Sequence, residues 1–269
     1  PDPVDYSSTF HNQASGDPTE PGYIAAVTEE ISRVLKHDMT IPVVINGDEI
    51  TTNECVNGTD PGDNGKEWYM YCVANKPMID KAVEVSRHGL TSWSDKSVAE
   101  RKAILFRVAE IMQEQRARTI ALMSRDAGKT VSEGDPEVSE AIDFARYYAT
   151  HGVDNTDSKA MGVVLVVPPW NFPYAIPAGG VCAALAAGNT VILKPAPETV
   201  ATAWILAQQL WEGGVREQRA AAHGIAPEKL EDFYADRNLL KSRVRSSDVA
   251  ASISFLLSDE SSRTTGAVL

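Results

Sequence analysis

The sequence predicts an α/β fold: a partial doubly wound, Rossmann-like parallel sheet preceded by N-terminal helices. Two apolar runs carry the prediction, GVVLVV at 162–167 and TVILK at 190–194, and both are typical of buried parallel strands. A helical pattern follows each run, AIPAGGVCAALAAG after the first and a stretch from about Glu198 to Gly213 after the second. Strand, helix, strand and helix in succession indicate parallel strands joined by a crossover helix.

The composition is that of a folded globular chain. Its 269 residues are 43% hydrophobic and 23% charged, enough for one large domain or two modest ones. A net charge of −12 argues against nucleic acid as a partner. No apolar run reaches the length of about 18 residues that a membrane span needs. The widely spaced Cys55, Cys72 and Cys182 predict neither a disulfide framework nor a metal site, and they favour a cytoplasmic location.

The N-terminal third alternates helix, strand and loop signals. Residues 1–22 are polar and contain four prolines, so we expect a linker or an arm laid on another part of the protein. Residues 23–35 have the periodicity of an amphipathic helix. The segment IPVVING at 41–47 predicts a strand and a turn, 53–66 a polar loop, and WYMYCVA at 68–74 a second strand.

Three helices are expected next, because each has a recognisable start. Asn75 opens the first, with a proline two residues later. Ser97 and Glu100 form the capping-box pattern of the second. Asp135 and Pro136 are typical of the start of the third. We expect these helices to cover one side of the sheet, and we assign them no chemistry.

The candidate site lies beyond the two predicted parallel strands. Ligands of open α/β sheets bind at the carboxyl ends of the strands, where Asn171 and Lys194 are found. An amide there can donate to a developing oxyanion, and a lysine can bind a ribose hydroxyl or a phosphate. Trp170 and the two prolines before it offer an apolar wall for a flat ring. The alternative is a loop asparagine and a surface lysine with no ligand.

The residues VVLVVPPWNFPYAIPAGGVCAALAAGNTVILKPAPET resemble the aldehyde dehydrogenase superfamily. The closest resemblance is to the L-glutamate γ-semialdehyde (Δ1-pyrroline-5-carboxylate) dehydrogenase half of bifunctional proline-utilisation enzymes, over about residues 1–215. It implies NAD-dependent oxidation of L-glutamate γ-semialdehyde to L-glutamate, in proline catabolism. It also implies that Asn171 stabilises the oxyanion. The resemblance further implies that the nicotinamide side of NAD is lined by Val167, Pro168, Pro169 and Trp170. It implies that the adenosine ribose is contacted by Lys194, Pro195 and Ala196.

Two departures from the family pattern affect these expectations. Where many NAD-using relatives have a glutamate, the chain has Pro197, with Glu198 one place later, which leaves NADP as an alternative cofactor. The family's nucleophilic cysteine and general-base glutamate lie in segments that find no match here, so we expect a truncated chain without activity of its own. Cys182 lies in a helix of small apolar residues and is expected to be a packing thiol.

The tail has a different character from the rest of the chain. Residues 216–269 hold eight basic and eight acidic side chains, so the net charge of −12 belongs to residues 1–215. The runs DVAASISFLLSD and TTGAVL resemble the end of a short-chain dehydrogenase/reductase of the rhamnulose-1-phosphate aldolase/alcohol dehydrogenase type, over 217–269. That family's glycine turn and Tyr-x-x-x-Lys pair are not matched. We therefore expect a chimera that is incomplete relative to either parent family.

Four segments follow from these patterns: the arm at 1–22, a helix-and-strand region at 23–160, half a dinucleotide-binding domain at 161–215, and the tail at 216–269. We expect 265–269 to add a strand to the sheet. The expected partner is a small-molecule aldehyde, and exposed sheet edges favour a homo-oligomer. Two alternatives remain: a short-chain dehydrogenase acting on a sugar-derived alcohol, and a non-catalytic nucleotide-binding remnant.

Overall fold

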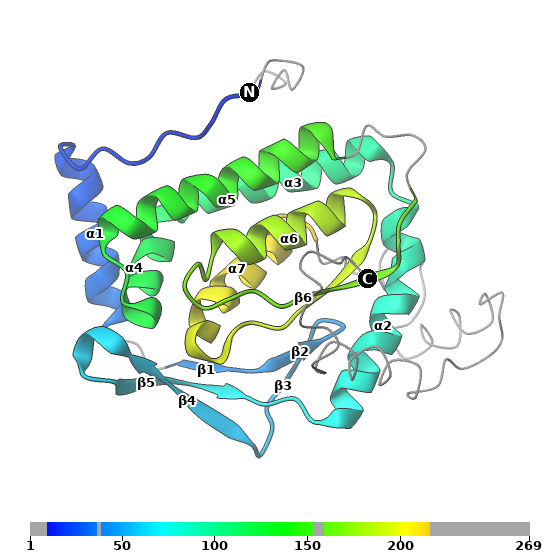
Figure 1. Ribbon diagram of the computed structural model, residues 1–269, viewed down its shortest axis with the longest axis horizontal. Coiled ribbons are helices and arrows are strands. Elements are labelled where there is room, and N and C mark those ends of the chain that lie inside the picture. The colour runs from blue at the N-terminus through cyan, green and yellow to red at the C-terminus, as the bar shows by residue number, and fades with distance from the viewer. Residues whose placement is uncertain (1–9, 37–38, 153–158, 216–269) are drawn as a thin grey trace, which may run out of the picture. The chain divides into compact units, whose positions relative to one another are not determined.

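The computed structural model describes residues 10–36, 39–152 and 159–215 (Figure 1). The chain divides into two units, Pro1–Arg216 and Glu217–Leu269, and all the described residues belong to the first. The predicted strand at 265–269 and the segment that resembles a short-chain dehydrogenase therefore lie outside the described residues. Within those ranges, no helix combines the length and the apolar character needed to cross a membrane.

Helices account for most of the described residues. The α-helices are Pro21–Val34 (α1), Lys76–Ser94 (α2), Val98–Glu114 (α3), Arg116–Ala127 (α4), Val131–His151 (α5), Ala175–Ala186 (α6) and Val200–Glu212 (α7). Two short 3-10 helices are η1 (Pro61–Asp63) and η2 (Pro197–Thr199). Figure 1 shows α5 lying along α3, with α6 beside the pair, and α4 against α1.

The described strands form three separate sheets. They are Met39–Ile41 (β1), Val43–Ile45 (β2), Asp48–Ile50 (β3), Cys55–Asp60 (β4), Lys66–Cys72 (β5), Val163–Val166 (β6) and Thr190–Leu193 (β7). One sheet has the order β1-β5-β4, β2 and β3 form a hairpin, and β6 pairs with β7. Helices and a parallel strand pair in one unit confirm the predicted α/β class.

The parallel pair at the predicted positions is confirmed. β6 and β7 run parallel in register from Val163↔Thr190 to Val166↔Leu193, and α6 connects them. The expectation that both strands are buried on both faces is wrong, because Leu165 is 46% exposed. Val166 faces α6, whereas the face that carries Leu165 is covered in part by α2, where Thr190 Oγ1 donates to the Ser86 carbonyl at 2.9 Å. The predicted N-terminal helical cover thus extends over part of the sheet.

The predicted strand and turn at 41–47 become two short strands. Pro42 separates β1 from β2, because proline has no N–H to continue a strand ladder. β1 pairs with β5, while β2 folds back on β3. The hairpin turn is Asn46-Gly47 with φ values of 55° and 90°, the left-handed backbone for which this dipeptide is favoured.

The polar loop predicted at 53–66 is wrong, since β4 occupies much of it. Gly58 suggested a loop, yet the Tyr69 ring on the facing strand lies across it, and a Cβ there would fall 1.9 Å from a ring atom. Glycine is required here by the close approach of the ring. The turn back to β5 runs through Asn64 and Gly65, both with positive φ. The second predicted strand, β5, is confirmed.

Side-chain caps form at three of the seven described α-helix starts, those of α2, α3 and α5, and one of them differs from the prediction. The Asn75 cap and the Ser97–Glu100 capping box form as predicted. The third helix, however, begins at Val131 with a Thr130–Glu133 capping box, and Pro136 lies inside it. The Asp135 carboxylate does not cap this helix; it accepts from Arg116 at 2.7 Å instead. The sequence patterns also missed α4, which begins directly after the end of α3.

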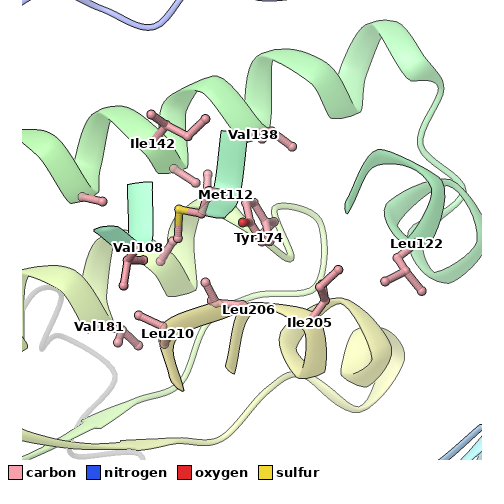
Figure 2. Packing of buried hydrophobic residues seen from close by; sticks show 14 of the residues in the cluster. Val108, Met112, Leu122, Val138, Ile142, Tyr174, Val181, Ile205, Leu206 and Leu210 are labelled. Carbon is pink, nitrogen blue, oxygen red and sulfur yellow. The ribbon is translucent and has the colours of Figure 1, made fainter. Parts of the chain in front are cut away.

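The hydrophobic core of the described residues lies where α3, α5, α6 and α7 converge. Figure 2 shows their side chains pointing into this shared interior. The labelled members include Val108 and Met112 from α3, Val138 and Ile142 from α5, Val181 from α6, and Ile205, Leu206 and Leu210 from α7. Because α6 and α7 are the helices that follow β6 and β7, the core fixes both strands relative to α3 and α5.

The N-terminal arm lies on α5 over its described part. Asn12 Nδ2 and the Gln13 N–H both donate to Asp143 at 2.7 Å. The Gly16 N–H donates to Asp135, also at 2.7 Å. Through these contacts, residues 12–16 of the segment predicted as a linker or an arm lie against α5.

Candidate functional site

The candidate site forms where β6 and β7 end side by side. The last register pair is Val166↔Leu193, and the Lys194 N–H donates to the Val166 carbonyl at 2.9 Å. Residues 167–171 and 194–196 therefore leave the same edge of the sheet. This is the carboxyl edge at which open α/β sheets bind their ligands.

The two segments present an open, largely apolar surface. Val167 is 58% exposed and Trp170 is 54% exposed. Asn171 and Lys194 are exposed as well, so their polar ends are available to a ligand. Of the other predicted residues, Pro169 is exposed, Pro195 is half-buried, and Pro168 and Ala196 are buried.

A buried carboxylate fixes the end of the first segment. Glu137 of α5 is 2% exposed, and its Oε1 accepts from the N–H groups of Tyr174 at 2.8 Å and Ala175 at 3.0 Å. Those N–H groups belong to the start of α6, where a helix leaves its donors without internal partners. Oε2 forms an ion pair with Lys129, whose ammonium lies 4.2 Å from the centre of the Phe172 ring. Through these contacts, the buried Glu137 holds the loop that carries Asn171 in place.

A second buried contact holds the same turn. The Tyr174 hydroxyl donates to Gln209 Oε1 at 2.6 Å, and Gln209 Nε2 donates to Thr119 Oγ1 at 3.1 Å. Burial raises the pKa of Tyr174, so the phenol stays protonated and remains a donor. The turn before α6 is therefore tied both to α7 and to α4.

The second segment is fixed through the start of α7. The Val200 N–H donates to the Tyr69 hydroxyl at 3.2 Å. Asp126 Oδ2 accepts from the Thr202 N–H at 2.7 Å and from its hydroxyl at 2.8 Å. Burial raises the pKa of Asp126 to about 7 from an ordinary value of 3.8. Ala196 itself accepts from the Thr199 N–H at 3.1 Å, which turns the chain from the strand into the helix.

The supporting residues Glu137, Lys129 and Asp126 were not found from the sequence. Glu137 gave one weak signal, because it occupies an apolar stripe of its helix together with Val138 and Ala141. A carboxylate at such a position is buried only when it is paired. The partners lie in other elements, and local spacing does not reveal them.

The three cysteines lie outside the two segments of the candidate site, 167–171 and 194–196. Cys182 is fully buried in α6, and burial raises its pKa to about 12, which confirms the expected packing thiol. Cys55 and Cys72 face each other on β4 and β5. The placement of Cys55 in a polar loop was wrong. Residues 167–171 and 194–196 contain no thiol, so this edge offers binding groups and an amide donor but no nucleophile.

Comparison with known proteins identifies the class. The sequence model of the aldehyde dehydrogenase family matches residues 49–218, which include the whole candidate site. The chain belongs to the aldehyde dehydrogenase family. Among curated relatives, it is 32% identical over 243 residues to the 1-pyrroline-5-carboxylate dehydrogenase of Staphylococcus epidermidis, covering 84% of this chain and 47% of that protein. The corresponding Geobacillus sp. enzyme is 35% identical over 189 residues, or 65% of this chain and 37% of the relative.

Solved structures agree with these relatives. A Thermus 1-pyrroline-5-carboxylate dehydrogenase with bound NAD superposes with a TM-score of 0.71 at 26% identity, over 77% of this chain and 43% of that one. Proline utilization A from Bdellovibrio bacteriovorus gives a TM-score of 0.73 at 28% identity, over 77% of this chain and 23% of the other. The chain thus spans about half the length, or less, of the curated relatives named above, at 47% of the Staphylococcus epidermidis enzyme and 37% of the Geobacillus sp. enzyme.

Proposed function

We propose that this chain contributes the strand-edge half of an NAD site to the oxidation of L-glutamate γ-semialdehyde to L-glutamate. The observation that carries the proposal is the side-by-side exit of 167–171 and 194–196 from parallel strands. Membership of the family and the names of the similar dehydrogenases support it. The Thermus structure with bound NAD supports the choice of cofactor.

The residues present fit such a cofactor. The exposed side chains of Val167 and Trp170, with Pro168 and Pro169 between them, form an apolar ledge for the nicotinamide side. Lys194 carries an exposed ammonium for a ribose hydroxyl, flanked by Pro195 and Ala196. NAD, when bound, supplies the hydride acceptor. Asn171 would donate its amide N–H to the oxyanion that develops from the aldehyde.

The thiol chemistry of the family does not reside at this edge. The family reaction needs a cysteine thiolate, and the raised pKa of the buried Cys182 keeps that group protonated. We therefore expect the chain to bind NAD and to show no aldehyde oxidation on its own.

We further propose NAD rather than NADP as the preferred cofactor. Glu198 is exposed in η2, two residues after Ala196. A carboxylate near the ribose accepts from a 2′-hydroxyl and repels a 2′-phosphate. NADP binding as tight as NAD binding would contradict this assignment, and Glu198→Gln is expected to narrow the difference between the two cofactors.

The test is an NAD titration by calorimetry, paired with an assay of NADH formation from the semialdehyde. Lys194→Ala and Trp170→Ala should each weaken NAD binding by roughly tenfold, which corresponds to a loss of about 1.4 kcal/mol of binding free energy. Lys76→Ala, which removes an exposed ammonium on α2, serves as the matched control and should leave affinity unchanged. Absence of NAD binding by the wild-type chain would refute the proposal. Turnover that disappears in Asn171→Ala would refute the expected lack of activity and support the role of the amide.

The tail is the basis of a second candidate function. Its equal count of eight basic and eight acidic residues sets it apart from residues 1–215. We propose that 217–269 derives from a short-chain dehydrogenase that acts on a sugar-derived alcohol, and that the chain is a chimera. Thiol-independent oxidation of a sugar alcohol, retained in Asn171→Ala, would favour this candidate. A chain that binds NAD without any turnover would correspond to the nucleotide-binding remnant.

A further inference from the structure

β4 and β5 bring two thiols into contact. Cys55 and Cys72 are direct cross-strand partners, and their Sγ atoms lie 3.6 Å apart. The Val73 N–H donates to the Glu54 carbonyl at 2.9 Å, so the ladder bond flanks the cysteine pair and the two residues are a non-hydrogen-bonded pair. Such pairs have Cα atoms about 4.5 Å apart and the closest side chains. That separation falls within the range of roughly 4.4–6.8 Å that a disulfide bridges.

The two thiols differ in access. Cys72 is buried, and its Sγ accepts from the Thr52 N–H at 3.4 Å. Cys55 is half-buried, and its Sγ donates to the Thr52 carbonyl at 3.3 Å. An incoming reagent therefore meets Cys55 first, with Cys72 directly behind it. Cys182, the remaining cysteine, is enclosed in α6 with no exposed surface.

We propose that Cys55 and Cys72 form a reversible dithiol–disulfide modification site that low-molecular-weight disulfides such as oxidised glutathione oxidise. The hydrogen bond with Cys72 raises the pKa of the Cys55 thiol, so the reaction proceeds through the fraction that has lost its proton to solvent. The Cys55 thiolate attacks one sulfur of the glutathione disulfide; a mixed disulfide forms and one glutathione thiolate leaves. The Cys72 thiolate then attacks Cys55 Sγ, forms the Cys55–Cys72 bond and releases the second glutathione. The protein loses two protons and two electrons, and the glutathione disulfide gains the two electrons. Excess thiol reverses both steps.

This site shares no residue with the proposed NAD site, because neither cysteine belongs to β6, β7 or the segments that follow them. Its structural effect is to join β4 to β5 covalently at the end of the pair opposite the Asn64–Gly65 turn. The bond would close a loop over residues 55–72. Sheet pairing already holds that loop in the reduced chain.

The experiment treats the full chain with oxidised glutathione and measures intact mass, free-thiol count and the cross-linked peptide. We expect the mass to fall by two hydrogens and the free thiols to fall from three to one, with the Cys55 and Cys72 peptides joined. Cys72→Ala should instead retain one glutathionyl group on Cys55. Cys182→Ala is the matched control and should oxidise as the wild type does.

Each other outcome overturns the proposal. Three thiols that stay free show that the pair does not react. A glutathionyl adduct that persists on wild-type Cys55 shows that Cys72 does not resolve it. A disulfide between two chains, or a cross-link that includes Cys182, assigns the oxidation elsewhere. Peptide mapping of the wild-type chain decides the matter even where the Cys72→Ala variant folds poorly.

Discussion

The buried Glu137 is the residue whose removal most directly tests how the candidate site is held. Glu137→Ala removes the acceptor of two N–H groups at the start of α6 and leaves Lys129, whose side chain is only 13% exposed, without its carboxylate. Breaking a buried ion pair by removing one partner costs about 3–5 kcal/mol. For a unit of this size, that loss lowers Tm by about 10 °C.

Two further variants separate the charge from the hydrogen bonds. Glu137→Gln keeps an oxygen for the Tyr174 and Ala175 N–H groups but not the charge, so a smaller loss of about 1.5–3 kcal/mol is expected. A Lys129→Met/Glu137→Gln double variant should regain part of that loss, because no uncompensated charge remains. Glu140→Ala, at an exposed position of the same helix, should change the free energy of unfolding by less than about 0.5 kcal/mol.

The assay is urea unfolding followed by circular dichroism and tryptophan fluorescence. The expected order of stability is wild type and Glu140→Ala first, then Glu137→Gln, then Glu137→Ala. If Glu137→Ala costs no more than Glu140→Ala, the contacts with α6 do not stabilise the fold, and the account of how the Asn171 loop is held is refuted.

Three other predictions concern packing, pH and the arm. Gly213→Ala should lower the free energy of unfolding by about 1–3 kcal/mol, because its Cβ would lie 2.3 Å from Val108 Cγ2. Gly22→Ala, with open space around it, should be neutral or slightly stabilising, and urea unfolding of both variants checks this. The folded-state pKa of Asp126 is about 7, above its ordinary 3.8, so the folded state binds the proton more tightly and wild-type stability should fall as pH rises from about 4 to about 7. Asp126→Asn should flatten that dependence, and an unchanged slope would show that another group causes it. Asp143→Ala should loosen the arm at residues 12–13 and speed its proteolysis there without a large change in Tm, and equal cleavage rates would contradict a role of these two contacts in holding the arm.

The elements that the sequence predicted correctly are those with local signals. The apolar runs of β6 and β7 and the Ser97–Glu100 capping box need no information from elsewhere in the chain. The positions of Asn171 and Lys194 at one edge also followed, because parallel strands end on the same side. This much of the candidate site is a consequence of strand order and direction.

The elements that were missed depend on distant partners. Asp135 resembled a cap, but its carboxylate binds Arg116 and the Tyr23 hydroxyl, and the helix starts earlier. Gly58 resembled a loop residue, but the ring of a facing strand explains it. The role of Glu137 depends on backbone groups of α6, which lie far along the chain. Spacing within one segment carries no record of such contacts.

The close approach of Tyr69 to Gly58 links the β4–β5 pair to the start of α7, which lies far along the chain. The same Tyr69 hydroxyl accepts from the Val200 N–H at the first residue of α7. Any side chain larger than hydrogen at position 58 must displace the ring, and with it an acceptor that fixes the segment after Lys194. A larger residue at position 58 should therefore be tolerated only together with a compensating change at position 69. That second change would also alter the contact with the start of α7.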